Sequence, residues 1–242
     1  MNGEDPQERP ELIKNIINGL ERYNPEAAGT LESYLQEQCD QKFCDASANR
    51  ALLKLYQLNP DRINNEAITN TLVKCMTLFP SPQFDLALHL LSPAIANPSA
   101  ANAGSSTSEL AEAVAKLRAL NAQLEGAQYA RFWATMDSDD LYADLTTDIA
   151  GFEEMIRVRI AQLVSQAFRE VNLSVLEAWL GINDEAEARK YVTEACGWKV
   201  DADGVVQIPR NPENEAKKAE IREYVNVDMF SRVIRRAWEA AA

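Results

Sequence analysis

The segment 173–209 places the tightest constraint on what this chain can fold into. It begins with a short apolar-faced helix that breaks at Gly181. Asn183 or Asp184 can then cap a second helix, because either side chain accepts a hydrogen bond from a free backbone N–H of the first turn. Gly197 follows the last apolar position of that helix, and glycine readily takes the left-handed conformation that stops a helix. The segment therefore predicts two consecutive helices.

A predicted hairpin follows directly. The runs 198–200 and 205–208 are rich in β-prone residues, and the sequence Asp201-Ala202-Asp203-Gly204 joins them. Asp-Gly between two such runs is a hairpin signal, because a tight turn needs residues that tolerate a positive φ. Helix, turn, helix and hairpin in this order predict a winged helix.

Upstream of this segment, apolar residues recur at helical spacing in a series of short helices with short connections. We expect a first helix over 11–24, with Leu20 on its apolar stripe, and a long helix over 152–171 that leads into the winged helix. The clearest stripes between them are Leu31, Tyr34, Leu35 and Gln38; Ile68, Leu72, Val73 and Met76; and Leu110, Val114, Leu117, Leu120 and Leu124. Stacked helix pairs of this kind predict a degenerate HEAT- or TPR-like array.

These patterns predict a mainly α-helical chain of two domains. Residues 1–10 are expected to be a disordered lead, 11–148 a HEAT-like helical repeat domain, and 149–209 the winged-helix domain with its small β-hairpin. Within the repeat domain, the small-residue tract 92–108 is expected to be a flexible loop. Residues 210–242 are expected to form a charged connector and C-terminal helices that pack on the winged helix.

The four tryptophans are expected to lie in the core. Trp179, Trp198 and Trp238 are assigned to the winged helix, and Trp133 to the last helix pair of the array.

Composition limits the class of partner. The chain has 242 residues and a net charge of −13, with no signal-peptide pattern and no apolar run long enough to span a membrane, so a cytoplasmic protein is expected. A winged helix that reads DNA needs a basic second helix. Here the segment 184–196 carries four acidic and two basic residues. A protein-docking module is the favoured interpretation.

The sequence predicts no catalytic, metal or cofactor site. His89 is the one histidine and stands among leucines, which favours a packed or rim residue over a proton carrier. Cys39 and Cys44 do not have the spacing of a common zinc site, and the Asp201–Gly204 segment has its glycine at the wrong position for a calcium loop. No phosphate-binding glycine loop is present. The sequence therefore indicates a protein without enzyme activity, cofactor or metal.

Four blocks carry a resemblance to a known family. LERYNPEAAGTLESYLQEQ at 20–38, ANRALLKLYQLNP at 48–60, GFEEMIRVRI at 151–160 and GWKVDADGVVQI at 197–208 together resemble the subunit K family of eukaryotic translation initiation factor 3. The order and spacing of the blocks agree over nearly the whole chain. The resemblance implies a HEAT-like domain followed by a winged helix, related to the PCI modules of the proteasome lid and the COP9 signalosome. It implies no catalytic activity and no cofactor.

The resemblance also implies partners. The protein would be a scaffold subunit of initiation factor 3, bound chiefly to subunit L and reaching the small ribosomal subunit through the complex. An equivalent PCI subunit of the proteasome lid or signalosome is the alternative from the same structural class.

Two sets of residues are candidates for contacts. The partner surface is expected on the wing and the terminal helices, with Val205–Ile208 as an edge strand that another strand could pair with; its candidate residues are Trp198, Val200, Val205, Val206, Ile208, Phe230 and Ile234. The other interpretation of the wing residues is that they pack on their own helices. An RNA-binding winged helix is a further alternative, with Arg210, Lys217, Lys218, Arg232, Arg235 and Arg236 as its contacts.

Overall fold

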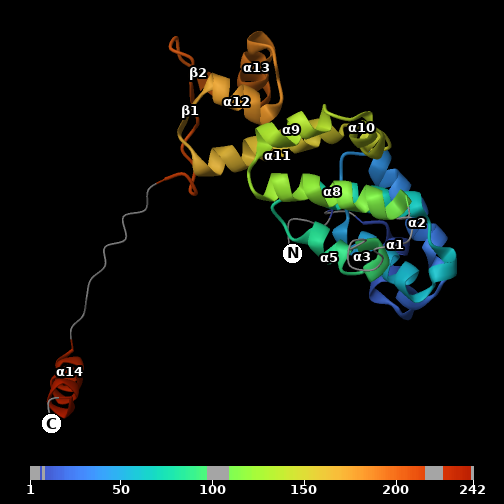
Figure 1. Ribbon diagram of the computed structural model, residues 1–242, viewed down its shortest axis with the longest axis horizontal. Coiled ribbons are helices and arrows are strands. Elements are labelled where there is room, and N and C mark those ends of the chain that lie inside the picture. Colours follow the sequence, from blue (N-terminus) through green and yellow to red (C-terminus); the bar gives the residue numbers. More distant parts are fainter. Residues whose placement is uncertain (1–5, 7–8, 97–108, 216–225, 241–242) are drawn as a thin grey trace, which may run out of the picture.

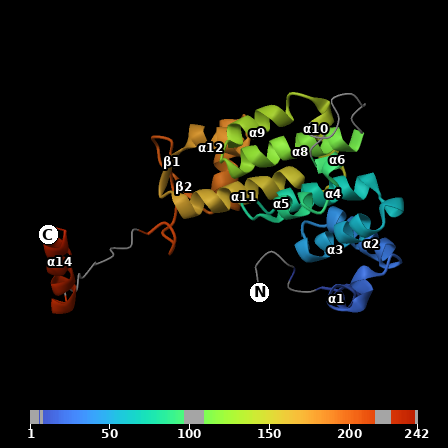
Figure 2. The same cartoon turned by 60° about the horizontal axis from the view of Figure 1, so that its bottom comes forward.

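The computed structural model describes residue 6 and residues 9–96, 109–215 and 226–240. Figure 1 shows a stack of helices that leads into a small unit of helices and strands, and Figure 2 shows the same arrangement from a second side. One cluster of buried apolar side chains runs from Ile13 in the first helix to Ile208 at the end of the wing. The two units expected from the sequence therefore share a continuous core.

The helical array is formed by the first two thirds of the chain. Its elements are α1 (Glu11–Asn18), the 3₁₀ turn Leu20–Tyr23, α2 (Ala27–Asp40), α3 (Ala46–Leu58), the 3₁₀ turn Pro60–Arg62, α4 (Asn65–Met76), α5 (Gln83–Leu88), α6 (Pro93–Ala96), α8 (Glu109–Glu125), α9 (Tyr129–Met136) and α10 (Asp140–Thr147).

The helical stripes expected from the sequence face the core. The stripe residues named above on α2, α4 and α8 are all buried. Asn64 caps α4 by accepting hydrogen bonds from the backbone N–H groups of Glu66 and Ala67. Local periodicity was sufficient here, because a helix with one apolar face can bury it only against its neighbours.

Two segments of the array differ from expectation. The first helix ends at Asn18 instead of residue 24, and the side chain of Leu20 is 91% exposed instead of packed. Within the expected loop 92–108, Pro93–Ala96 form the helix α6, which packs against α8. The rest of that loop lies outside the described residues.

Arg9 lies near the end of the N-terminal segment 1–10, which was expected to be disordered, and its side chain is anchored to the helical array. Its guanidinium donates two hydrogen bonds to the carboxylate of Asp45, at 2.5 and 2.7 Å. Asp45 is buried, caps α3 by accepting from the backbone N–H of Ala48, and also accepts from the hydroxyl of Tyr34. This carboxylate therefore ties the chain before α1 to the start of α3.

The winged helix is formed by α11 (Phe152–Ala167), β1 (Glu170–Asn172), α12 (Leu173–Leu180), α13 (Glu185–Lys190), a π-helical turn (Tyr191–Ala195), β2 (Lys199–Val200) and β3 (Val205–Gln207). Asp184 caps α13, Gly197 has a φ of 68° at the expected stop, and Gly204 has a φ of 75° in the hairpin turn.

The sheet has one more strand than the hairpin alone. Its order is β1-β3-β2, with both pairs antiparallel and Val171 opposite Val206. The long helix expected over 152–171 therefore ends at Ala167, and the residues after it pair with β3. Helical periodicity did not predict this change, because the partner strand lies about 35 residues further along the chain.

The helical array and the winged helix meet at Trp133 and Gly181. The indole Nε1–H of Trp133 donates to the backbone carbonyl of Trp179 at 2.9 Å, and Arg157 donates to the carbonyl of Leu180 at 3.0 Å. Gly181 has a φ of 64°, and a Cβ placed on it would lie 2.5 Å from the indole ring of Trp133. Gly181 thus both ends α12 and leaves room for the tryptophan of α9.

Substituting Gly181 tests this contact. Gly181→Ala is expected to lower the free energy of unfolding by about 1–2 kcal/mol for the left-handed backbone and by about 1–3 kcal/mol more for the clash with Trp133. Gly197→Ala is the matched control, because Gly197 has nearly the same φ and no atom lies within 4 Å of its added Cβ. Urea denaturation of both variants measures the difference; equal losses would show that the ring contact contributes nothing.

Removing the Arg9 anchor tests the buried carboxylate. Arg9→Ala leaves Asp45 without its cationic partner, and the loss of one member of a buried ion pair costs about 3–5 kcal/mol. Arg62→Ala is the comparison, because it breaks the exposed pair Arg62–Glu26, for which a loss within about 1 kcal/mol is expected. A loss for Arg9→Ala as small as that for Arg62→Ala, measured by urea denaturation, would contradict the anchoring role.

Candidate docking surfaces

The wing does not present the edge strand that the sequence indicated. β3 is the central strand of the sheet, flanked by β1 and β2. Its backbone groups are already engaged on both sides, so an added strand has no access to Val205–Gln207. The edges of the sheet are β1 and β2 instead.

The candidate wing residues divide between core and surface. Trp198, Val206 and Ile208 are buried, and Val206 has no exposed surface. Val200 and Val205 are partly exposed. The first three residues belong to the chain's own buried apolar cluster, which favours the alternative interpretation that they pack within the chain. A substitution such as Val206→Asp would therefore disrupt the core and could not serve as a probe of an interface.

The C-terminal helix differs most from expectation. α14 (Val227–Glu239) was expected to pack on the winged helix, but none of its residues is buried and Figure 1 shows it apart from the rest of the structure. Phe230 is 62% exposed and Trp238, expected in the core, is 76% exposed. The other C-terminal helix, expected from the sequence over 219–225, lies entirely outside the described residues. Of the candidate partner residues, Phe230 and Ile234 are thus on an open surface.

The candidate RNA contacts do not form one described patch. Arg210 is exposed just after the wing, and Arg232, Arg235 and Arg236 are exposed on α14. Lys217 and Lys218 lie outside the described residues.

The helix α13 is acidic, as expected. It is the helix that a DNA-reading winged helix would place in the major groove of DNA. Its first turn has Glu185 and Glu187, and Arg189 is engaged with Glu185 in an ion pair. This leaves little free positive charge for phosphate contacts.

The residues considered for catalysis and metal binding lie apart. His89 is exposed at the end of α5, whereas Cys39 and Cys44 are buried. Burial raises the pKa of the Cys39 thiol, and a hydrogen bond with Cys75 together with burial holds the pKa of Cys44 well above its ordinary value. A protonated thiol is neither a good nucleophile nor a metal ligand. Within the described residues, no group of three His, Cys, Asp or Glu side chains could hold a metal ion.

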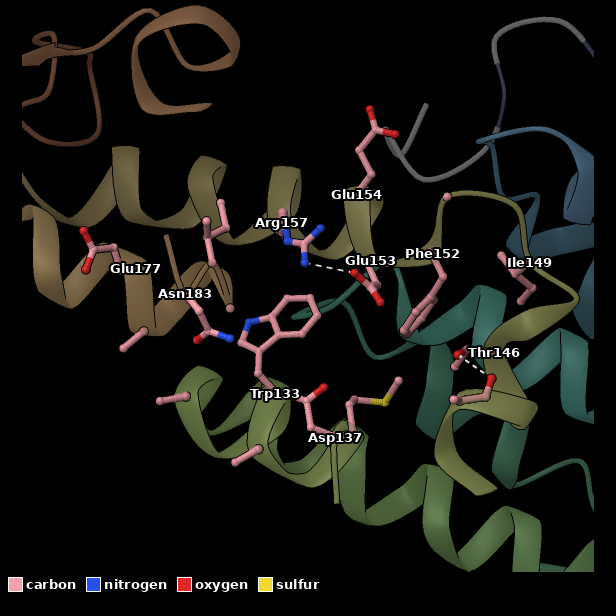
Figure 3. A pocket seen from close by; sticks show the side chains of 18 of the residues that line it. Trp133, Asp137, Thr146, Ile149, Phe152, Glu153, Glu154, Arg157, Glu177 and Asn183 are labelled. Atoms are coloured by element: carbon pink, nitrogen blue, oxygen red, sulfur yellow. Dashed lines mark hydrogen bonds and ion pairs between the residues drawn. The ribbon is translucent and has the colours of Figure 1, made fainter. Parts of the chain in front are cut away.

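A groove of about 900 Å³, here called the junction groove, lies where the helical array meets the winged helix. Figure 3 shows Trp133 near its middle, with acidic side chains around it. The groove is lined by residues of α9, α10, α11 and α12 and of the connections that follow α9, α10 and α12. Its charged residues are Asp137, Glu153, Glu154, Arg157 and Glu177. Four carboxylates against one guanidinium make it an acidic surface suited to a basic partner.

Sequence reasoning did not predict the junction groove. Gly181 was interpreted as a helix stop and Trp133 as a core residue of the last helix pair. Gly181 does end α12 and Trp133 is buried, but the contact between them joins residues nearly fifty positions apart. Gly181 follows one predicted helix and Trp133 lies within another, and neither position indicates that the two residues meet.

No helix in the described part of the chain combines the length and apolar character needed to cross a bilayer.

Comparison with known proteins identifies the family. Residues 62–220 match the CSN8/PSMD8/EIF3K family. The chain is 73% identical over 242 residues to a Neurospora crassa protein named eukaryotic translation initiation factor 3 subunit K, with both chains covered completely. Proteins of the same name from Pyricularia oryzae (strain 70-15) and Botryotinia fuckeliana are 72% and 52% identical, covering 100% and 97% of this chain and 98% and 96% of theirs.

The relatives agree in length as well as in sequence, and none of those named here is a proteasome or signalosome subunit. The chain therefore belongs to the CSN8/PSMD8/EIF3K family, and within it to the group of subunit K of eukaryotic translation initiation factor 3.

Proposed function

We propose that this protein is a cytoplasmic, non-catalytic scaffold subunit of initiation factor 3. It docks to a neighbouring PCI subunit, chiefly subunit L, and supports assembly of the initiation complex on the small ribosomal subunit. The names of the full-length relatives support membership of the factor. The main observation in support of the docking role is the uncovered apolar face of α14.

The residues of α14 are spaced for docking as a helix. Val227, Phe230, Ile234 and Trp238 follow one another at intervals of three or four residues and lie on one face. All four are exposed. A single helix of 13 residues is marginal in water, and most helical stability comes from packing an apolar face against a partner. Such spacing is typical of an amphipathic helix that binds in the groove of another helical protein.

The wing has a smaller part in this proposal than the sequence indicated. Val200 and Val205 are the wing candidates that retain exposed surface. The free edges at β1 and β2 each measure three residues or fewer. We therefore assign the main contact to α14 and a supporting contact to the wing.

Binding of subunit L by α14 variants tests the proposal. Phe230→Asp together with Ile234→Asp is expected to weaken capture of subunit L at least about tenfold, because burial of each side chain contributes about 1.5–3 kcal/mol. The helix has no buried residue, so the fold of the remaining chain is unaffected. The measurement is a pull-down with purified full-length proteins over a range of concentrations.

Arg236→Glu is the control, since it makes the same change in net charge on the same helix at a position two residues from Ile234, and therefore on the opposite face. Unchanged binding by the double variant would remove α14 from the interface with subunit L. Capture of ribosomal RNA in place of subunit L, with a steep dependence on salt concentration, would favour the RNA-binding alternative.

A further inference from the structure

A second groove, here called the α11 groove, runs along one face of α11. Two hollows of about 290 and 260 Å³ form it, and they meet at Val158 and Gln162, which line both. Met155, Val158, Gln162 and Ser165 follow one another at intervals of three or four residues. They therefore make one stripe along about 15 Å of the helix.

The α11 groove exposes apolar side chains. Val158 is 43% exposed. Other apolar residues that line the groove are partly exposed, namely Phe43, Leu78, Met155, Tyr191 and Cys196. The charged residues of its lining are engaged within the chain, since Lys42 pairs with Glu154 and Arg159 donates to the backbone carbonyls of Leu78 and Phe79. An occupant with an uncharged face can therefore cover the groove without separating a charge from its partner.

The helix α14 has an apolar face that spans half of its circumference. At 100° per residue, its apolar and polar residues fall into two separate halves. The apolar half consists of Val227, Met229, Phe230, Val233, Ile234, Ala237 and Trp238. Walls on two sides cover a face of this width better than a flat surface does. The helix is about 20 Å long, so most of its length can lie along the stripe of α11.

The connection to α14 starts at one end of the α11 groove. The side chains of Asn211 and Asn214 donate to the backbone carbonyl of Ser165 at 2.8 and 3.0 Å, which anchors the chain after the wing beside the end of α11 (Figure 1). From this anchor, the residues between Glu215 and Asn226 can span up to about 40 Å. This reach exceeds the length of the stripe, and a short tether holds the helix at an effective concentration on the order of millimolar.

We propose that α14 docks along the α11 groove of its own chain when no partner subunit is bound. Phe230, Val233 and Ile234 then pack over Val158, and the arginines of α14 stay on its solvent side. Docking covers the apolar faces of both the helix and the groove, so a partner that binds α14 must displace it first. The docking itself does not depend on the proposed function, because it requires only this chain.

Hydrogen–deuterium exchange on the isolated full-length protein tests the docking. The amides of α14 are expected to exchange at least about tenfold more slowly than those of a synthetic peptide of residues 226–242, independently of protein concentration. Val158→Asp is expected to remove most of this protection, because it places a charge against the apolar face of the helix. Ala195→Asp, at an exposed position on the winged-helix side of the groove, is the second variant and is expected to lower the protection as well.

Val175→Asp is the matched control for Val158→Asp. Val175 is also a valine on a helix surface, 36% exposed, and it does not line the α11 groove. The protection of α14 is expected to be unchanged in this variant. Urea denaturation of each variant verifies that the body of the protein remains folded.

Three results would each overturn the proposal. The first is exchange in α14 of the wild-type protein that is as fast as in the peptide. The second is protection that rises with protein concentration, which would identify a second copy as the occupant. The third is protection that neither groove variant lowers, or that Val175→Asp lowers equally, which would place the helix elsewhere. None of these results depends on binding of subunit L.

Discussion

The contact between Trp133 and Gly181 holds the two halves of this protein in one arrangement. The indole occupies the space that a side chain on residue 181 would fill, and its N–H satisfies the carbonyl of Trp179 next to the break in the chain. Arg157 satisfies the following carbonyl, that of Leu180. Buried and partly buried helix ends need such partners, because their last carbonyls have none within the helix. The core of the helical array is therefore continuous with the core of the winged helix.

Charged groups inside the array serve the same purpose at other helix ends. Asp45 joins the start of α3 to Arg9, and buried Lys74 donates from Nζ to the carbonyl of Gln41 at 2.9 Å, just beyond the end of α2. Burial lowers the pKa of Lys74, since the protein interior disfavours its charged form. Both side chains stabilise connections between helices where backbone groups would otherwise be left without partners.

Exposed apolar surface is distributed unevenly between the wing and α14. The wing buries Trp198, Val206 and Ile208 in its own domain, so the hairpin is a structural element first. The apolar residues of α14 are instead left uncovered by the described structure. A surface of this kind is typical of interaction sites, because an exposed apolar face is stabilised when a partner covers it.

The sequence by itself determined the helices, their inward faces, the caps at Asn64 and Asp184 and the hairpin turn at Gly204, because each depends on residues a few positions apart. Tertiary structure decided what depends on distant residues. It paired β1 with β3 and so made the expected edge strand central, bound Arg9 to Asp45, and left α14 uncovered although its apolar pattern resembles that of a core helix. Periodicity shows that a helix has an apolar face; the positions of the other elements decide whether anything within the same chain covers it.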